Sequence, residues 1–288
     1  MSSSFSHSSL AAAGPGAGQT SNKASLREIH LLCMNDSDTT AFTAAVTKHY
    51  PDLPSLTEIT HHNCALKYVP QDVQFDAVVS PANSYARLDG AFDDALARAY
   101  GPPGDYGWIT RKAQAVVYDR WRGFAPPGTC TVVPLDHEGQ FSSPPLGRRD
   151  AEPLNAWGTK YLLLCPTMRV PQNVEWDKEV VYECIWSLLC AVDNHNRDVR
   201  QREAEEPRPT RSTGRVQVQH AEIKSVLMTP LATGAGYVSP KRWAEQCVLA
   251  MKHWVAAVEK PEVWSKVGWG EAYRQHYEVA ATYKTALR

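Results

Sequence analysis

The chain has 288 residues, of which 43% are hydrophobic, so it can bury one substantial core or two small ones, and a single α/β domain with decorations is the first expectation. Its formal net charge is -1, which excludes the chain-wide basic field that drives non-specific binding to nucleic acid or membranes. Any anion recognition must therefore be local, and no nucleic-acid partner is expected from the net charge.

The seven cysteines form no CxxC pair and no Cys/His cluster with zinc spacing. Most lie in apolar runs, where a free thiol behaves as a small core residue, and their odd number favours a reducing compartment. No apolar stretch approaches the length of a membrane span, and the Ser, Ala and Gly-rich residues 1–26 hold no signal-peptide core. We therefore expect an intracellular protein, cytoplasmic or nuclear, with a disordered tail at 1–26 and neither metal nor cofactor.

From residue 27 onward, short apolar runs alternate with helical patterns, which predicts a layered α/β domain with a largely parallel sheet. Helices are predicted at 39–50, after the capping residues 36–38, and at 178–192, where apolar residues recur at helical spacing. The candidate strands are residues 28–34, 56–61, 76–80, 130–135, 161–165 and 225–230.

Two segments break the alternation of strands and helices. Residues 136–157 are rich in proline and glycine, and residues 194–219 form a run of charge and proline, so both are predicted to be surface insertions in a domain spanning 27–257. The remaining residues, 258–288, form an extension rich in Trp and Tyr. At this density the aromatic side chains are expected to pack against the domain.

The first of two notable strand-to-helix turns follows the strand at 76–80. Pro81 removes a ladder donor and ends the strand, and a polar loop containing Asn83 leads into a helix that begins near Gly90. A helix start at the end of a parallel sheet offers unpaired backbone N–H groups and the positive end of the helix dipole. This turn is therefore predicted to bind an anion.

The second turn follows the strand at 225–230 and contains two glycines, Gly234 and Gly236, which are expected to let the backbone approach a ligand and adopt positive φ. Ser239 followed by Pro240 is a good N-cap for the next helix. A Rossmann fingerprint is excluded, because Ser239 stands where the third glycine belongs and the turn lies late in the chain. The sequence also lacks a Walker A loop and a Gly-x-Ser-x-Gly elbow.

Taken together, the two turns resemble the signature of the macrodomain (Appr-1″-p processing) family, in a fungal-type form with insertions. Val79-Ser80-Pro81-Ala82-Asn83-Ser84, followed by Asp89-Gly90-Ala91-Phe92-Asp93, is similar to the family's Asn-Ala-Ala-Asn-like motif and Gly-Gly-Gly-Val-Asp-like loop. Thr233-Gly234-Ala235-Gly236-Tyr237 is similar to its phosphate-binding loop. The resemblance implies a three-layer α/β/α fold with a mixed, largely parallel central sheet, and a groove for ADP-ribose or an ADP-ribosylated ligand.

The resemblance also implies roles for individual residues. Asn83 and Asp93 are the candidate catalytic residues: Asn83 contacts the distal ribose, and Asp93 positions or activates water. Asn63 stands where the family commonly has an aspartate that accepts a hydrogen bond from the adenine amino group. The full set of expected ligand-binding residues is Asn63, Cys64, Asp89, Gly90, Ala91, Phe92, Thr233, Gly234, Ala235, Gly236 and Tyr237.

Each of these roles has a structural alternative. Asn83 can bond its own loop backbone, Asp93 can simply stabilise a helix start, and Tyr237 can seal the core instead of covering a ribose. In the first turn, Asp89 and Ala91 replace family glycines, which adds a negative charge and narrows the space for a phosphate.

Three functions remain open at this point. The chain can be a hydrolase acting on ADP-ribose 1″-phosphate or on ADP-ribosylated substrates. It can be a non-catalytic ADP-ribose reader. It can also be a protein with a degenerate groove that binds protein partners through its insertions, because one fold hosts several functions.

Overall fold

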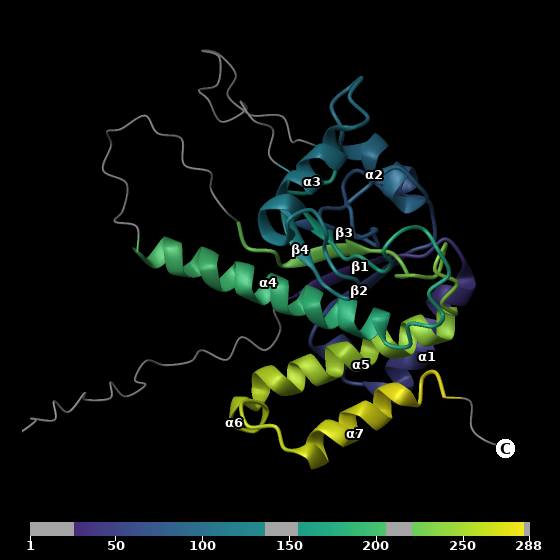
Figure 1. Ribbon diagram of the computed structural model, residues 1–288, viewed down its shortest axis with the longest axis vertical. Coiled ribbons are helices and arrows are strands. Elements are labelled where there is room, and N and C mark those ends of the chain that lie inside the picture. Colours follow the sequence, from purple (N-terminus) through teal and green to yellow (C-terminus); the bar gives the residue numbers. More distant parts are fainter. Residues whose placement is uncertain (1–25, 136–154, 206–220, 285–288) are drawn as a thin grey trace, which may run out of the picture.

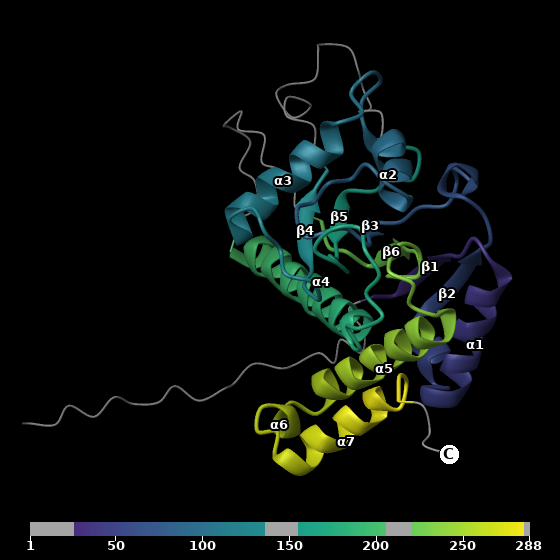
Figure 2. The same cartoon turned by 45° about the vertical axis from the view of Figure 1, so that its right-hand side comes forward.

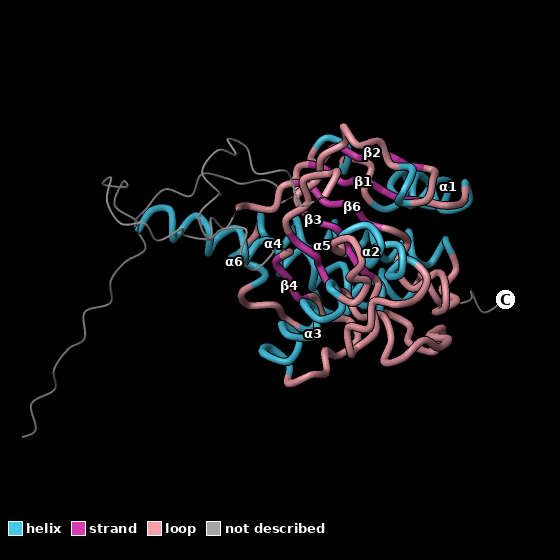
Figure 3. The backbone as a smooth tube through the Cα atoms, turned by 90° about the horizontal axis from the view of Figure 1, so that it is seen from above, coloured by secondary structure: helices cyan, strands magenta, loops and turns pink. Residues whose placement is uncertain are grey.

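The computed structural model describes residues 26–135, 155–205 and 221–284, and it places one sheet between two layers of helices (Figure 1). Residues 1–25 of the predicted tail, 136–154 of the insertion predicted at 136–157 and 206–219 of the insertion predicted at 194–219 lie outside the described residues. Asn155 and Trp157 are buried, so the prediction of a surface insertion is wrong for residues 155–157. Within the described ranges, six strands form a sheet of order β2-β1-β6-β3-β5-β4, which Figure 3 shows from above. The strands are β1 Glu28–Leu32, β2 Glu58–His62, β3 Ala77–Ser80, β4 Thr131–Pro134, β5 Tyr161–Leu164 and β6 Ser225–Met228.

Only β4 runs antiparallel to its neighbour, β5, and the other pairs are parallel. The predicted α/β fold with a mixed, largely parallel sheet is therefore confirmed. Side chains alternate between the two faces of each strand, because successive residues of a strand point to opposite sides. In β3, for example, Val79 packs in the core on one face and Val78 in the core on the other.

The helices divide between these two faces, as Figure 2 shows. One face carries α1 (Asp36–His49), α4 (Val180–Glu205) and α5 (Pro240–Glu259), and the other carries α2 (Phe92–Tyr100) and α3 (Trp108–Trp121). The short helices η1 (Leu53–Ser55) and η2 (Leu66–Tyr68) lie in connections, and α6 (Pro261–Trp264) and α7 (Trp269–Ala280) lie beyond α5. None of the described helices is long and apolar enough to cross a membrane.

The helix starts nearest the sheet's carboxyl edge follow from their first residues. Helix α5 begins as predicted: the Ser239 hydroxyl accepts from the Arg242 amide at 3.3 Å, and Pro240 occupies the first turn. Helix α1 begins at Asp36, three residues before the predicted start at Thr39. Asp36 and Asp38 belong to its first turn, where acidic side chains are favoured by the helix dipole.

The prediction of a surface insertion from residue 194 onward is wrong for residues 194–205, because α4 continues to Glu205. The reason lies in two residues that the charged pattern hides. Asn196 is buried and pairs with the Ile223 backbone in both directions, donating at 2.8 Å and accepting at 2.7 Å. Val199 is buried as well. The polar face of a long helix therefore resembled a loop in the sequence.

The aromatic residues of the extension divide into two groups. Trp264 stacks on Trp186 of α4, with ring centroids 5.5 Å apart. Trp269, Tyr273 and Tyr277 are exposed on α7, and the Trp269 side chain is 80% exposed. The prediction that the aromatic side chains pack against the domain is wrong for these three, because α7 is buried through Val279 and Ala280 instead.

Candidate functional site

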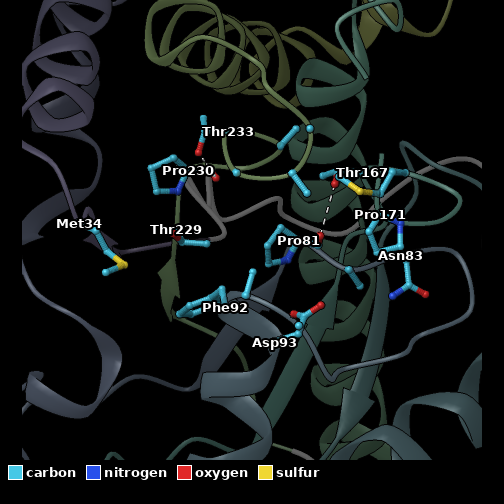
Figure 4. Close-up of a pocket in the computed structure, with 18 of the residues that line it drawn as sticks. Met34, Pro81, Asn83, Phe92, Asp93, Thr167, Pro171, Thr229, Pro230 and Thr233 are labelled. Atoms are coloured by element: carbon cyan, nitrogen blue, oxygen red, sulfur yellow. Dashed lines mark hydrogen bonds between the residues drawn. The ribbon is translucent and has the colours of Figure 1, made fainter. Parts of the chain in front are cut away.

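A cavity of about 500 Å³ lies where the parallel strands β1, β6, β3 and β5 end (Figure 4). The carboxyl ends of parallel strands are the usual place for a ligand crevice in an α/β sheet. Most of its lining comes from the loops after these strands. The residues around it are Met34, Asn35, Asp38, Pro81, Ala82, Asn83, Arg87, Asp89, Gly90, Ala91, Phe92, Asp93, Thr167, Met168, Pro171, Thr229, Pro230, Ala232, Thr233, Gly234, Ala235 and Gly236.

The loop after β6, residues 229–239, is closed by its own backbone. The Tyr237 amide donates to the Gly234 carbonyl at 3.0 Å, and the Val238 amide donates to the Ala232 carbonyl at 3.1 Å. Among the described residues, the amides of residues 233–236 donate to no protein acceptor. Four consecutive N–H groups are therefore available beside the cavity, which is the arrangement that cradles phosphate oxygens.

The glycines of this loop serve a different purpose from the predicted one. Positive φ falls at Ala232 (62°) and Tyr237 (58°), and neither Gly234 nor Gly236 has it, so that prediction is wrong. Gly236 is required for space, because a Cβ atom there would lie 2.4 Å from the Ala232 carbonyl oxygen and 2.9 Å from Val174 Cγ2. A Cβ atom at Gly234 would meet nothing within 4 Å.

The loop after β3, residues 81–91, is held by side chains. The Asn83 carboxamide oxygen accepts from the Tyr85 amide at 3.1 Å and the Arg87 amide at 3.3 Å, and its nitrogen donates to the Arg87 carbonyl at 2.8 Å. Asn83 therefore lines the cavity and also adopts the loop-bonding role that was its structural alternative. One N–H of its carboxamide remains for a ligand.

Two further residues of this loop bear on anion binding. Arg87 forms an ion pair with Asp89, so its charge is already partnered inside the loop. Ala91 precedes α2 with φ 50° and ψ -124°, a conformation that strains any residue except glycine. In this part of the chain the amides of residues 90–92 have no protein acceptor, which adds a second set of free donors at the start of α2.

Among the titratable residues that line the cavity, Asp93 has a pKa that is shifted to near neutral pH. Its side chain is buried at the cavity, with 7% exposed, and the Ser80 hydroxyl donates to its Oδ1 atom at 2.6 Å. Burial raises the pKa of Asp93 to about 7, the Ser80 hydrogen bond opposes this rise, and the charge of Asp89 adds to it. Asp93 is therefore poised to exchange a proton near neutral pH.

Three of the expected ligand-binding residues do not line the cavity. Asn63 is exposed at the end of β2, where its oxygen accepts from the Thr39 hydroxyl at 2.9 Å and its nitrogen donates to Asp36 at 3.1 Å. Cys64 packs against the core under α2 and α3. Tyr237 is 66% exposed, so it does not seal the core either.

Two lining segments were missed by sequence reasoning. One is the turn after β1, which contributes Met34, Asn35 and Asp38. The other follows β5 and contributes Thr167, Met168 and Pro171. The available signal was positional, since every parallel strand of the predicted sheet ends at the same edge.

The segment after β5 connects the two loops that face the cavity, residues 81–91 and 229–239. The Ser84 amide donates to the Met168 carbonyl at 2.9 Å, and the Val174 amide donates to the Gly236 carbonyl at 3.0 Å. The Thr167 hydroxyl reaches the Pro81 carbonyl at 3.4 Å, the bond drawn in Figure 4. This segment therefore fixes the position of one loop relative to the other.

No family model and no curated protein matches the chain. Among solved structures, it is similar to an Oceanobacillus iheyensis macrodomain with MES bound (12% identity, 74% of this chain and 85% of that chain, TM-score 0.37). It is also similar to that organism's macrodomain with ADP (10% identity, 65% and 87%, TM-score 0.31) and to a mutant with ADPR (10% identity, 65% and 89%, TM-score 0.31). At these identities and TM-scores the matches establish no family.

Proposed function

We propose that this chain binds ADP-ribose or a close derivative in the cavity at the ends of β1, β6 and β3. The observation that carries this proposal is the convergence of two sets of free backbone amides, residues 233–236 and 90–92, on one cavity. Two neighbouring anionic groups, such as those of a diphosphate, match two such sets of donors. The resemblance of both loops to macrodomain motifs supports the same ligand.

Groups that attract and groups that repel an anion both lie around the cavity. The α2 dipole and the free amides favour an anion, whereas the acidic residues of the lining, Asp38, Asp89 and Asp93, oppose one. Arg87 and Asp89 form an ion pair, so together they add no net charge to this part of the rim. Backbone groups therefore supply most of the attraction, which is consistent with a net charge of -1 for the chain.

Turnover of the bound ligand is the second part of the proposal, and it depends on Asp93. A carboxylate with a pKa of about 7 is half deprotonated at neutral pH and is basic enough to accept a proton from water. In this reaction the water oxygen attacks the phosphorus or the anomeric carbon of an ester on the distal ribose, and the water proton passes to Asp93. The ester bond breaks and its electron pair leaves with the displaced oxygen, which is the ribose oxygen after attack at phosphorus and the phosphate or carboxylate oxygen after attack at carbon. Asp93 then gives its proton to this oxygen or to solvent. The amides of residues 233–236 would stabilise negative charge on the diphosphate.

A reader without turnover is the alternative, and one observation favours it. The Asn83 oxygen is already occupied by the Tyr85 and Arg87 amides, which leaves a single N–H to orient a ribose. A site that binds without positioning the reacting groups would tolerate this arrangement.

Binding is tested by calorimetric titration with ADP-ribose, paired with thermal unfolding at increasing ligand. We expect saturable heat and a Tm that rises with ligand concentration, since a ligand that binds the folded state stabilises it. The absence of both at millimolar ADP-ribose overturns the binding proposal.

A pair of matched variants places the binding in the cavity. Ala235→Asp puts a carboxylate among the free amides at an exposed position, so we expect an unchanged Tm and a loss of affinity of at least about tenfold. Ala115→Asp makes the same change at an exposed position on α3, away from this cavity, and should bind like the wild type. Equal affinities for the two variants would mean that ADP-ribose binds elsewhere.

Turnover is tested separately with ADP-ribose 1″-phosphate and with ADP-ribosylated protein. If Asp93 accepts the proton, Asp93→Asn should lower kcat by about 100-fold or more while ADP-ribose still binds. Wild-type protein that binds ADP-ribose but releases product no faster than Asp93→Asn would be a reader.

A further inference from the structure

A second cavity, of about 380 Å³, lies between helix α4 and the turn at residues 127–129. It shares no lining residue with the cavity at the strand ends. Helices α6 and α7 lie on the same side of the sheet as α4 (Figure 2), and they contribute Trp264 and Gln275 to the wall. Three of the lining side chains are aromatic, and one, Glu183, is charged.

The aromatic part of the wall is a stack of three rings. Trp186 stacks on Trp264 with ring centroids 5.5 Å apart and planes at 24°, and Tyr182 stacks on Trp186 at 6.2 Å and 23°. The Tyr182 hydroxyl lies 3.0 Å from Nδ1 of His253, whose Nε2 lies 3.2 Å from Glu278. These contacts hold the tyrosine ring in place. The wall therefore presents nearly parallel rings in a fixed position, which suits a planar group.

Glu183 is the single charged side chain among the described residues of this lining, and its carboxylate lies against the turn. A Cβ atom at Gly128 would be 2.6 Å from Glu183 Oε2, so the carboxylate itself reaches the wall that Gly128 forms. No hydrogen bond or cation from the described ranges engages it. Partial burial raises the pKa of Glu183, and the negative charges of Asp177 and Glu179 raise it further. A bound cation would stabilise the ionised carboxylate.

The neutral polar side chains of the lining have already used several of their donors. The Ser187 and Thr129 hydroxyls each donate to a backbone carbonyl at 2.7 Å. The side-chain nitrogen of Gln275 donates to Glu271 at 3.1 Å. The second N–H of this amide and the indole N–H groups of the two tryptophans remain. The strongest polar group of the wall is thus the ionised carboxylate, which can only accept hydrogen bonds.

A guanidinium group fits this combination of aromatic rings and carboxylate. It is planar and positively charged, with five N–H donors and no acceptor, so it can lie parallel to the rings and direct one edge at the carboxylate. An ammonium group is a compact, strongly hydrated charge and gains less from a flat stack. Free arginine is a poorer ligand, because its α-carboxylate would meet the charges of Asp177 and Glu179. An arginine inside a polypeptide has no such carboxylate.

We propose that this cavity binds an arginine side chain of a partner protein, with the guanidinium group stacked on the aromatic wall and paired with Glu183. This inference goes beyond the proposed function and does not rest on it, because the two cavities share no residue and no nucleotide is needed to test it. It gives Trp264, in the aromatic-rich extension, a role in recognition.

The first test uses the wild-type protein and three blocked tripeptides with glycine on either side of arginine, lysine or citrulline. Citrulline has nearly the shape of arginine but no charge. We expect the arginine peptide to bind with a Kd of about 1 mM, the lysine peptide about threefold more weakly and the citrulline peptide at least about tenfold more weakly. NMR titration of the tryptophan indole signals measures each Kd.

Three results of this titration would overturn the inference. One is no binding of the arginine peptide at about 20 mM. Another is equal binding of the citrulline peptide, which would mean that charge is not recognised. The third is equal binding of the lysine peptide, which would assign the cavity to cations in general.

Free arginine, titrated in the same way, separates the two sources of a guanidinium group. We expect it to bind more weakly than the blocked arginine peptide, because of the acidic residues beside Glu183. Tighter binding of free arginine would make the ligand a small molecule and overturn the assignment to a partner protein.

A pair of charge variants tests the carboxylate. Glu183→Gln keeps the size of the side chain and removes its charge, so the arginine peptide should bind about tenfold more weakly while the Tm stays the same or rises. Glu203→Gln makes the same change at an exposed position of α4 outside this cavity and should bind like the wild type. Wild-type affinity in a folded Glu183→Gln protein would overturn the inference.

A pair of aromatic variants tests the ring stack. Trp264→Leu keeps an apolar side chain but removes the outer ring system, so the arginine peptide should bind about fivefold more weakly. Trp269→Leu makes the same change at a position that is 80% exposed and outside the lining, and it should have no effect. The opposite pattern would place the peptide on α7 and overturn the inference. Because the peptide series needs no variant, the proposal stays testable even if Trp264→Leu does not fold.

Discussion

The two loops that face the cavity are built by opposite means. Residues 229–239 are closed by backbone hydrogen bonds and keep a run of free amides, with Gly236 pressed against Ala232 and Val174. Residues 81–91 are tied together by the side chains of Asn83, Arg87 and Asp89, and they end at a strained Ala91. The first arrangement leaves donors for an anion, whereas the second leaves a buried acid, Asp93, at the cavity.

The two proposed tasks, anion binding and proton transfer, therefore depend on different parts of the site. Free amides need only a rigid backbone, and their donor capacity does not depend on pH. A buried carboxyl is sensitive to its surroundings, and its pKa follows from burial and neighbouring charge. Changes in the loop after β6 should therefore act mainly on packing and affinity. Changes in the loop after β3 and at the start of α2 should act mainly on pH dependence and strain, with a smaller effect on affinity.

Gly236→Ala tests the packing of the loop after β6. The added methyl group would overlap the Ala232 carbonyl oxygen and Val174, so the loop must shift, at a cost of about 1 to 3 kcal/mol in the free energy of unfolding. Denaturant unfolding measures this cost. Gly234→Ala is the matched control, because its methyl group meets no atom, and it should stay within about 0.5 kcal/mol of the wild type. Similar losses for both variants would show that the packing of Gly236 is unimportant.

Asp93→Asn tests the buried acid through the pH dependence of stability. The pKa of Asp93 is raised in the folded state to about 7, so the folded protein binds a proton that the unfolded chain releases near pH 4, and stability falls as pH rises between these values. From pH 5 to pH 8 the wild type should lose about 2 to 3 kcal/mol from this group alone. The asparagine variant has no carboxyl group at this position, so it should not show this loss of stability. Parallel stability curves for the two proteins would contradict the raised pKa.

Ala91→Gly tests the strain at the start of α2. The positive φ of Ala91 costs about 1 to 3 kcal/mol, whereas glycine adds about 0.4 to 1 kcal/mol of unfolded-state entropy, so the variant should be more stable by about 1 kcal/mol. Thermal or denaturant unfolding gives the sign. Ala115→Gly on the exposed side of α3 should instead destabilise by about 1 kcal/mol. A destabilised Ala91→Gly protein would show that the strain is absent.

The smallest effect is expected for Asp89→Asn. This change removes a negative charge from the cavity rim and frees Arg87, so ADP-ribose should bind roughly threefold more tightly at low salt. The gain should shrink at about 1 M salt, where charges are screened within about 3 Å. Titrations at two salt concentrations measure both parts. Weaker binding at low salt would mean that the ion pair helps to form the site.

Much of the fold was predictable because its signals are local. The six strands lie within the predicted segments or one residue beyond them, and Ser239 and Pro240 marked the start of α5 correctly. The predictions failed where the local composition indicated a different structure from the one that tertiary contacts stabilise. The charged second half of α4 resembled a loop because only Asn196 and Val199 are buried there, and α3 was not anticipated at all.

The candidate site divides in the same way. Asn83, Asp93 and the glycine loop were identified from motifs, and they line one cavity. Asn63 was assigned by position in a motif, yet its hydrogen bonds to Thr39 and Asp36 turn it away from that role. Asp38 carries no motif, and its place in the cavity depends on β1 lying beside β6 in the sheet, a pairing between segments nearly two hundred residues apart.

The sequence by itself determined the alternation of strands and helices and the two turns with free helix-start and loop amides, because hydrophobic period, proline and capping residues act over a few neighbours. The tertiary structure decided which turns face one cavity, that positive φ falls on Ala232 and Tyr237 instead of the glycines, and that Asp93 and Asp38 are buried. These properties arise from strand order and burial, which depend on contacts between distant segments and on exclusion of water. Neither strand order nor burial can be predicted from a local sequence pattern.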